Sequence, residues 1–205
     1  MLKHGFKQSQ ADHTLFVKHS LHGKTTALIV YVDDVVLTGN DVKEISHLKE
    51  YLAKEFEINN LGYLKYFLDI EVARSKDVIF ICQRKYVLDL LKETGMLGGR
   101  PCDTPLEPDQ KLSEDQEGDP VDRGRYQRLV DKLINLSHSR PDIAIAVSIV
   151  SQFMHAPRTF HLEVVMRILR YLNSSPEKGL YFSKHGYLSV EAFTDTDWAG
   201  SVTDR

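Results

Sequence analysis

The chain has 205 residues, of which 42% are hydrophobic and 27% are charged, and its formal net charge at pH 7 is −3. This is the composition of an ordinary globular protein, long enough for one sizeable domain or parts of two. No apolar run approaches the roughly 20 residues that a membrane span needs, and the first residues lack the apolar core of a signal peptide. Cys82 and Cys102 lie far apart and outside any metal-like spacing, so we expect no disulfide framework, no zinc site and a reducing intracellular compartment.

The first third of the chain is predicted to form strands and one helix. Alternating apolar residues over 13–18 and 25–31 indicate two strands. Asn40 or Asp41 can cap a helix over 41–55. The apolar stripe of this helix should pack under the strands, and it consists of Ile45, Leu48, Leu52 and Phe56.

The middle of the chain is predicted to form a second hairpin, a helix and a linker. The expected elements are strands at 63–73 and 78–82 around a turn at 75–77, and a helix at 84–94 that ends at Gly95. Residues 98–122 are rich in glycine, proline and acids, which is typical of a linker.

The pattern then becomes helical. The expected elements are helices at 123–139, from Pro141 to about Met154 and at 159–173, followed by strands at 180–182 and 187–194. The predicted buried stripe of the last helix consists of Leu162, Val165, Met166, Leu169 and Leu172.

Charge is distributed unevenly along this second half. From Pro101 to Asp122 there are eight acidic residues against Lys111 alone, whereas Arg123 to Leu172 holds eight Lys and Arg against three acids. A basic helical block is the electrostatic footprint expected for a phosphate backbone, and a solvated helix surface gives the same count.

Tyr31-Val32-Asp33-Asp34 is the stretch that most favours chemistry. It lies between apolar runs at 27–32 and 35–37, which predicts a strand, a tight turn and a strand with Asp33 and Asp34 at the tip. Adjacent carboxylates repel unless a cation lies between them, and oxygen ligands suit Mg²⁺ when a substrate phosphate completes its shell. A solvated turn is the alternative, because Asp is an ordinary turn residue.

Tyr-x-Asp-Asp between two apolar strands resembles the polymerase active-site hairpin of reverse transcriptases, and IVYVDDVVLTGND is similar to that of copia-type LTR retrotransposons. Further blocks resemble the same family in its order: LGYLKYFLDIEV (61–72), QRKYVLDLLKETGM (83–96), the segment 125–172 and FTDTDWAGS (193–201). The resemblance therefore covers essentially the whole chain.

The resemblance implies an α+β fold in four parts. A partial polymerase palm, with an antiparallel sheet and helices on one face, is expected over 1–97. The acidic linker follows at 98–122, then a mainly helical thumb and connection block at 123–178. A terminal β segment at 179–205 resembles the start of a ribonuclease H domain, with Asp195 as its first metal-binding carboxylate.

The activity implied is templated addition of deoxynucleotides to a primer hydroxyl, with Mg²⁺ or Mn²⁺ held by Asp33 and Asp34. Such chemistry uses two cations about 3.5–4 Å apart, and the family supplies a third Asp from a strand upstream of the hairpin. Asp12 is the sole acid before the hairpin here, and it is not at that position. We therefore expect little polymerase activity from the chain alone, so primer extension on poly(rA)/oligo(dT) that Asp33→Asn abolishes would contradict this expectation.

The resemblance also implies that the chain contacts an RNA or DNA template-primer and dNTPs. Its other expected partners are the remaining segments of a Pol polyprotein, and no contact with a membrane is expected. Asp69 replaces the glycine of the family's FLGIEV primer-gripping hairpin, and a carboxylate there should weaken primer positioning unless it turns outward. The expected nucleic-acid-binding residues are Tyr31, Asp69, the thumb-helix face Gln127, Asp131 and Asn135, and Arg167 and Arg170 for phosphates, with Arg140 and Arg158 as further candidates.

Two alternatives stay open at this point. The chain could be a non-catalytic fragment that binds nucleic acid through its basic helical block. It could also be a decayed transposon remnant without function, because Asp69 and Asp131 stand where the family usually has glycine.

Overall fold

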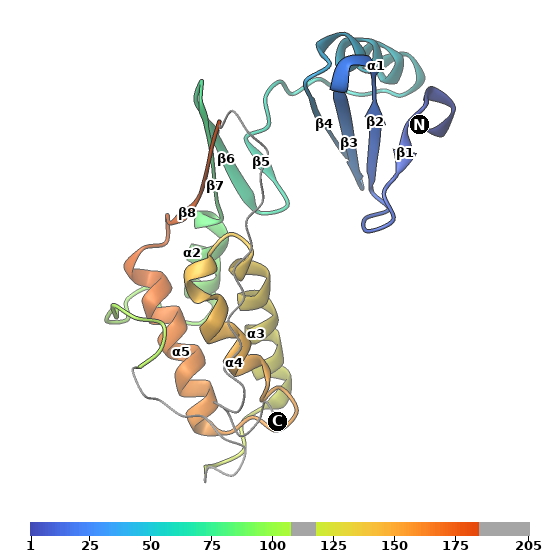
Figure 1. Ribbon diagram of the computed structural model, residues 1–205. Helices are drawn as coiled ribbons and strands as arrows, with labels where there is room; N and C mark the ends of the chain where they lie inside the picture. The colour runs from blue at the N-terminus through green and yellow to red at the C-terminus, as the bar shows by residue number, and fades with distance from the viewer. Residues whose placement is uncertain (108–117, 185–205) are drawn as a thin grey trace. The chain divides into compact units, whose positions relative to one another are not determined.

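The computed structural model describes residues 1–107 and 118–184 (Figure 1). The chain divides into two compact units, Met1–Leu64 and Lys65–Arg205, and each is described by itself. Each unit contains one four-stranded antiparallel sheet, accompanied by α-helices. The predicted α+β fold is therefore confirmed.

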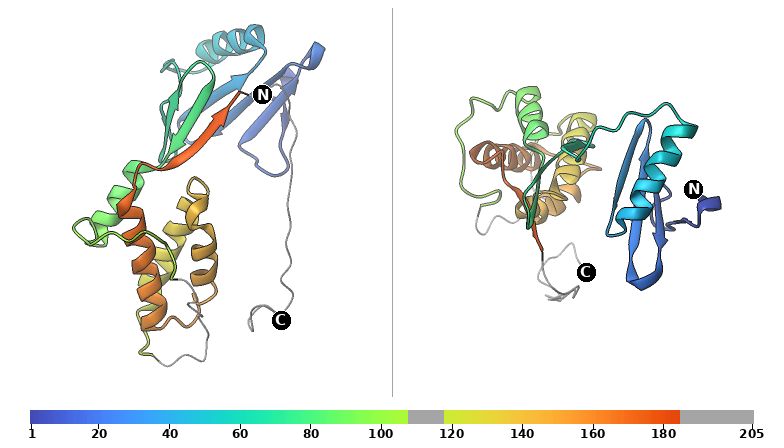
Figure 2. Two further views of the ribbon diagram at one scale, coloured as in Figure 1. Left: turned by 60° about the vertical axis from the view of Figure 1, so that its left-hand side comes forward. Right: turned by 90° about the horizontal axis from the view of Figure 1, so that it is seen from above.

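The first unit is a sheet covered by one helix. Its elements are the 3₁₀ turn η1 (Leu2–His4), β1 (Lys7–Gln8), β2 (Leu15–His19), the 3₁₀ turn η2 (Leu21–Gly23), β3 (Thr25–Tyr31), β4 (Asp34–Gly39) and α1 (Val42–Glu55). The strands lie in the order β1-β2-β3-β4, and α1 runs along one face of them (Figure 2). Asp41 caps α1, since its side chain accepts a hydrogen bond from the backbone of Glu44.

The core of the first unit is small. It consists of four buried residues, Phe6, Leu28, Leu48 and Leu52. Leu48 and Leu52 confirm the predicted stripe of α1, but Phe56 is 59% exposed and does not belong to it. The reason is that Phe56 follows the last turn of α1 and has an extended backbone, which takes its side chain off the helical stripe.

Gly39 fixes the path of the chain between β4 and α1. Its φ is 148°, and a Cβ atom at this position would lie 2.3 Å from the carbonyl oxygen of Thr25. No larger residue fits this close approach of two backbones. The end of β4 is further tied to β3 because the Asn40 side chain accepts a hydrogen bond from the Thr25 backbone at 2.7 Å.

The second unit joins a sheet to a group of helices (Figure 1). Its elements are β5 (Tyr66–Phe67), β6 (Ile70–Arg74), β7 (Val78–Cys82), α2 (Arg84–Glu93), α3 (Arg123–Ser137), the 3₁₀ turn η3 (Pro141–Ile143), α4 (Ala144–Ser151), α5 (Thr159–Ser174) and β8 (Gly179–Ser183). The predicted helices and the turn at 75–77 between two paired strands are confirmed, and Pro141 begins η3 as its first residue. The predicted continuous strand at 63–73 is wrong, because Leu68 and Asp69 have positive φ and form a turn that divides it into β5 and β6.

The four long helices enclose the main hydrophobic core, a cluster of eighteen buried residues. The predicted stripe of α5 is partly wrong, because Leu162 and Met166 are only partly buried. The buried face of α5 is wider than one stripe because this helix contacts α2, α3 and α4. The buried face of α5 also includes His161, Val164, Ile168 and Tyr171.

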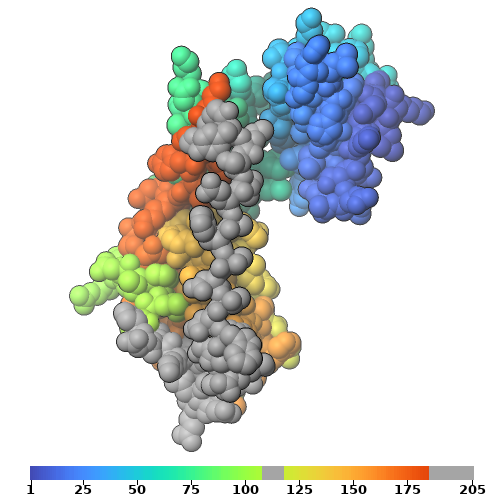
Figure 3. Space-filling model, in the orientation of Figure 1, coloured from blue at the N-terminus to red at the C-terminus, as the bar shows by residue number. Residues whose placement is uncertain are grey.

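Strand β8 returns from the helices to complete the second sheet, in the order β5-β6-β7-β8. It lies at the surface of the unit (Figure 3), and its predicted location at 180–182 is confirmed. Gly179 pairs with Cys82, and a Cβ there would lie 2.0 Å from the carbonyl oxygen of Ile81. Only glycine allows the two strands to pair at this point.

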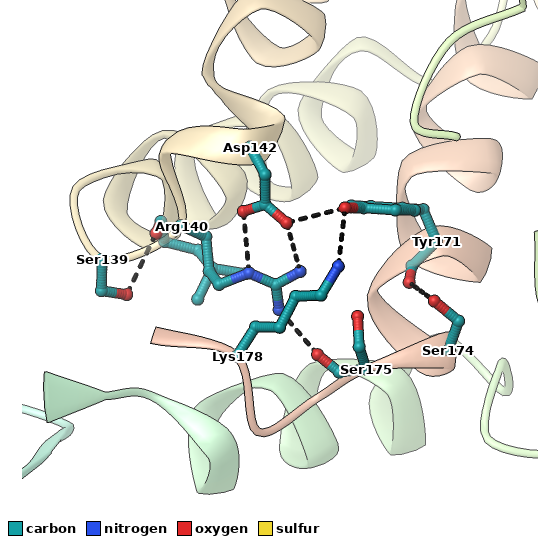
Figure 4. A network of polar contacts seen from close by, with 8 residues as sticks. Ser139, Arg140, Asp142, Tyr171, Ser174, Ser175 and Lys178 are labelled. Atoms are coloured by element: carbon teal, nitrogen blue, oxygen red, sulfur yellow. Dashed lines mark hydrogen bonds and ion pairs between the residues drawn. The ribbon is translucent and has the colours of Figure 1, made fainter. Parts of the chain in front are cut away.

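A buried polar network fixes the segment that precedes β8 (Figure 4). Arg140 is 1% exposed and binds both carboxylate oxygens of Asp142, at 2.9 and 2.8 Å. It also donates to the carbonyl oxygen of Ser175 at 2.9 Å, while Tyr171 donates to Asp142 at 2.8 Å. Lys178 reaches the hydroxyl of Tyr171 at 3.2 Å. The network therefore joins η3, α5 and the start of β8.

Candidate active site

The predicted hairpin tip is present at the end of β3 and β4. Tyr31 and Asp34 are paired across the two strands, so Val32 and Asp33 form a two-residue turn. Asp33 and Asp34 are both exposed. The structure thus places the two adjacent carboxylates at the bend that the sequence predicted.

The backbone of this turn adopts a conformation that is rare for its sequence. Val32 has a φ of 50°, in the left-handed region, and its side chain is 82% exposed. A β-branched residue with positive φ is a genuine outlier. Strained backbone of this kind is concentrated at functional sites, where the surrounding structure maintains it.

The two faces of the hairpin have different surroundings. Side chains alternate along a strand, and Leu37 packs against the core under α1, so Val35 shares that covered face. Asp34 therefore lies on the opposite face, together with its cross-strand neighbour Tyr31, which is 45% exposed. A carboxylate and a phenol ring are thus side by side on the face away from α1.

The donor chemistry of this tip suits a hard divalent cation. Asp33 and Asp34 offer carboxylate oxygens, the ligand type that Mg²⁺ prefers, at a point open to substrate and water. Within 1–107 and 118–184, no group of three His, Cys, Asp or Glu residues is arranged to hold a metal ion. The Asp12 carboxylate accepts hydrogen bonds from the backbone and hydroxyl of Thr14, at 2.8 and 2.7 Å.

Asp69 lies in the turn of the second unit's first hairpin. Phe67 pairs with Ile70, and the two residues between them, Leu68 and Asp69, have φ values of 47° and 63°. Such a turn favours glycine, although Asp tolerates the left-handed region better than most residues. Tyr66 donates a 2.7 Å hydrogen bond to the Asp69 carboxylate, and this bond raises the pKa of the Tyr66 hydroxyl.

The three predicted positions on α3 differ in their surroundings. Gln127 donates to the carbonyl oxygen of Met154 at 3.1 Å, and Asn135 accepts from Gln83 at 3.3 Å. Asp131 is exposed. Two of the three side chains therefore make contacts inside the second unit.

Most of the candidate arginines also bind internal groups. Arg167 contacts Thr104 and forms an ion pair with Glu107 at 2.6 Å. Arg158 donates to the carbonyl oxygen of Gly118, and Arg140 is the centre of the buried network. Arg170 is half-buried, and its Nε has no hydrogen-bond partner within the described residues. Three of these four arginines are thus engaged by groups of the chain itself.

The remaining predicted site residue, Asp195, and the predicted strand at 187–194 lie outside the described residues. The structure reveals one group of cations that we did not single out from the sequence, namely Lys65, Arg84 and Lys85 beside β5–β7. The sequence signal that could have identified this group is the adjacent pair Arg84 and Lys85, at the start of a helix that follows a strand.

Comparison with known proteins decides the family. Residues 1–108 match the family described as reverse transcriptase (RNA-dependent DNA polymerase). The chain belongs to the reverse transcriptase family. The matched residues include the Asp33-Asp34 hairpin and the Asp69 turn, so both candidate features of the polymerase lie in the part that defines membership.

Similar proteins include transposon polyproteins of this reverse transcriptase family. The chain is 40% identical to the retrovirus-related Pol polyprotein from transposon RE1 of Arabidopsis thaliana, over 100% of the chain and 14% of that protein. It is 30% identical to that from transposon TNT 1-94 of Nicotiana tabacum, over 98% of the chain and 16% of that protein. The copia-type resemblance is confirmed, and the chain spans about a seventh of such Pol polyproteins.

A shorter relative matches this chain over most of the length of both proteins. An uncharacterized mitochondrial protein of Arabidopsis thaliana is 37% identical over 87% of the chain and 74% of its own length. No solved structure matches the chain.

Family membership has general consequences. Reverse transcriptases, as intact enzymes, require a divalent metal ion and act on nucleic acids. In the part of the chain that the structure describes, no helix is both long and apolar enough to span a bilayer.

Proposed function

We propose that this chain supplies the Asp33-Asp34 metal site of an RNA-directed DNA polymerase of a copia-type retrotransposon. The observation that carries the proposal is the hairpin tip, where two neighbouring carboxylates lie in and directly after a strained turn within the segment that matches the family. The substrates are a template-primer and dNTPs, and the remaining Pol segments are the partners.

Asp33 and Asp34 would hold Mg²⁺, with Mn²⁺ as a substitute. The bound cation supplies charge stabilisation for an attacking primer hydroxyl and a leaving phosphate. The protein's own contribution is positional: β3 and β4 fix the two carboxylates, and α1 covers the opposite face of the sheet. Phosphoryl transfer depends almost entirely on such positioning and on electrostatics.

The second unit would contribute contacts to the primer strand. The turn at Leu68 and Asp69, which would lie at the primer, has a left-handed backbone conformation at both residues. Tyr66 holds the Asp69 carboxylate by a hydrogen bond, so the acid is directed toward the protein's own hydroxyl. This contact lessens the repulsion that Asp69 would otherwise exert on a phosphate.

Binding through the basic helical block is not favoured as an alternative function. Arg140, Arg158 and Arg167 bind carbonyl oxygens or carboxylates of the chain itself. Releasing them to bind phosphates would leave those acceptors without their donors.

The metal site can be tested without polymerase activity. Fe²⁺ with ascorbate replaces Mg²⁺ and cuts the backbone where it is bound, so cleavage should map to the β3–β4 tip and should be suppressed by excess Mg²⁺. Asp33→Asn combined with Asp34→Asn should abolish this cleavage. Asp77→Asn, which removes an exposed acid from another hairpin turn, should not. Cleavage that is unchanged in the double variant contradicts the proposal.

A further inference from the structure

The sheet of the second unit ends in a strand that has little protection along its outer edge. β8 is one edge of this sheet (Figure 1), and its sequence, Gly-Leu-Tyr-Phe-Ser, contains no charged residue and no proline. Proteins usually protect an exposed edge with such residues, or keep the edge strand very short. The opposite edge strand, β5, has only two residues. β8 is therefore the edge at which a further strand fits.

The backbone of β8 has hydrogen-bonding groups that point away from β7. The N–H of Lys184 donates to the carbonyl oxygen of Asp77 at 2.9 Å, so it points toward the β7 side. This direction alternates along an antiparallel strand, and the backbone polar groups of Tyr181 and Ser183 consequently point outward. Among the described strands, β8 pairs only with β7. The outward N–H and carbonyl groups are thus open to one more strand.

One face of this sheet is apolar and lies outside both hydrophobic cores. The register places Val72, Ile81 and Leu180 in one row of the face, and Arg74, Ile79 and Phe182 in the next. None of the five apolar residues belongs to either core cluster of the described residues. Phe182, at the β8 edge, is 53% exposed. A strand beside β8 would cover it if the apolar residues of that strand lay on the same face.

The residues that follow β8 have the sequence of a hairpin loop and a strand. Lys184, His185 and Gly186 come directly after β8, and the strand predicted from the sequence at 187–194 lies outside the described residues. A three-residue hairpin loop ends in a residue with a left-handed backbone, a position that favours glycine. Gly186 stands at that position. Such a loop pairs the residue after Gly186 with Ser183, whose polar groups point outward.

The register set by this loop agrees with the hydrophobic pattern. The loop would place Leu188 opposite Phe182. Two residues further on, Val190 would lie opposite Leu180. Both apolar side chains would then join the apolar face, whereas Ser189 would point to the other one. A slip by one residue would put Ser189 beside Phe182 and turn both apolar residues away from that face. Loop geometry and hydrophobic pattern therefore specify the same register.

We propose that residues 187–191 form a fifth strand that docks on the outer edge of β8, antiparallel to it and with Tyr187 opposite Ser183. This segment is a more favourable occupant of the edge than a second copy of the chain. The short loop already holds the two strands together, whereas the association of two chains costs translational and rotational freedom.

The docked segment precedes a predicted site residue. Glu191 lies opposite Gly179, the first residue of β8, and Asp195 follows four residues later. Asp195 is therefore tethered to the sheet that also carries the Asp69 turn. The inference does not depend on the proposed metal site of the first unit, because it rests on the edge of β8 and on the sequence that follows it.

Amide hydrogen exchange of the 205-residue chain, followed by NMR, tests the pairing. The N–H of Tyr181 should be protected to the same degree as that of Phe182, which points toward β7 and is the internal control. Gly186→Ala should lower the protection of Tyr181 about 5-fold or more, because an L-residue opposes the left-handed backbone of the loop. His185→Ala, one position earlier, should change it less. A Tyr181 amide that exchanges as if it were open, or equal effects of the two variants, overturns the proposal.

An engineered disulfide tests the register. Phe182→Cys combined with Leu188→Cys should form an intramolecular bond in a glutathione buffer, because side chains at a non-hydrogen-bonded pair lie close enough for a disulfide. Trypsin cleaves after Lys184, so the two cysteines lie on separate peptides. Mass spectrometry of the unreduced digest therefore identifies the bond directly, and the natural cysteines lie on other peptides.

The matched control moves one cysteine by a single residue. Phe182→Cys combined with Ser189→Cys should form the bond about 10-fold less, because Ser189 then lies on the other face of the sheet. Equal yields, a higher yield in the control, or no bond in either variant overturns the proposal. A disulfide-linked dimer on a non-reducing gel also overturns it, since a second copy would then occupy the edge.

Discussion

The two units of the molecule differ most in how their cores are built. The helices of the second unit enclose eighteen buried residues, whereas the first unit has a cluster of four. The second unit adds a buried polar network, and the first unit adds a strained turn. Buried apolar and polar contacts are therefore concentrated in one unit, and the two carboxylates of the candidate metal site belong to the other.

This difference teaches that the carboxylates are held by strand pairing more than by packing. Leu28 is fully buried on β3, but the tip itself is exposed from Tyr31 to Val35. Six cross-strand pairs from Thr26–Gly39 to Tyr31–Asp34 connect β3 and β4. We expect the first unit to lose its structure more readily than the second.

The largest effect should come from breaking the network of the second unit. Arg140→Met leaves Asp142 and the Ser175 carbonyl without their donor, and removing one partner of a buried ion pair costs about 3–5 kcal/mol. Urea unfolding followed by helical circular dichroism measures this loss. Arg128→Met is the control, because Arg128 is exposed on α3. Equal stabilities of the two variants would contradict the role assigned to the network.

The second test compares the two cores directly. Leu48→Ala should cost about 2–5 kcal/mol, and we expect this to remove the protection of β3 and β4 amides in hydrogen exchange while α3 stays protected. Leu133→Ala makes the same chemical change in the large core, where Leu133 is 0% exposed. It should lower the stability of the second unit without exposing its amides fully. Simultaneous loss of protection in both units by Leu48→Ala would show that the units unfold as one.

A smaller effect should appear as a dependence on pH. Burial alone would raise the pKa of Asp142, but hydrogen bonds from Arg140 and Tyr171 outweigh it, and the pKa lies below its ordinary value of 3.8. The carboxylate therefore stabilises the fold above this ordinary pKa, and the contribution is lost as the pH falls through the lower folded value.

Asp142→Asn should thus reduce the free energy of unfolding at pH 7 by about 1.5 kcal/mol, through weaker hydrogen bonds. The difference from the unaltered chain should shrink below about pH 4. Unfolding curves recorded from pH 7 to 3 measure it, with Asp131→Asn as the exposed control. A difference that is independent of pH would mean that the charge of Asp142 contributes nothing.

The smallest effect concerns the strained turn. Val32→Gly relieves a left-handed residue that costs about 1–2 kcal/mol, but glycine adds about 0.5–1 kcal/mol of entropy to the unfolded chain. The first unit should become more stable by no more than about 1 kcal/mol, measured by exchange of β3 and β4 amides. Val36→Gly, within β4, should destabilise the same strands. A loss of stability in Val32→Gly would show that the turn is unstrained.

The sequence predicted most elements because their signals are local. Asp41 and Pro141 each act through the adjacent turn of backbone, and the β3–β4 tip depends on a polar pair between two apolar runs. The sequence also identified Asp69 as an unusual residue, because the family has glycine at this position. The structure supplies the reason, which is the positive φ of the turn.

What could not be predicted depends on partners distant in the chain. Arg140 carries the same charge as a phosphate-binding arginine, and only its contacts with Asp142 and Ser175 show that it serves the fold. The width of the buried face of α5 depends on three neighbouring helices. The cations beside β5–β7 come from separate segments of the sequence, since Lys65 precedes β5 whereas Arg84 and Lys85 begin α2.

The hydrogen bond from Tyr66 to Asp69 has an evolutionary consequence. Aspartate and glycine codons differ by one base, and the Tyr66 hydroxyl tethers the acid at a turn position with positive φ. We therefore expect a single mutational step at this position to alter the charge beside the turn more than its backbone. Departures from a family pattern can accumulate at such a position without any trace in the fold.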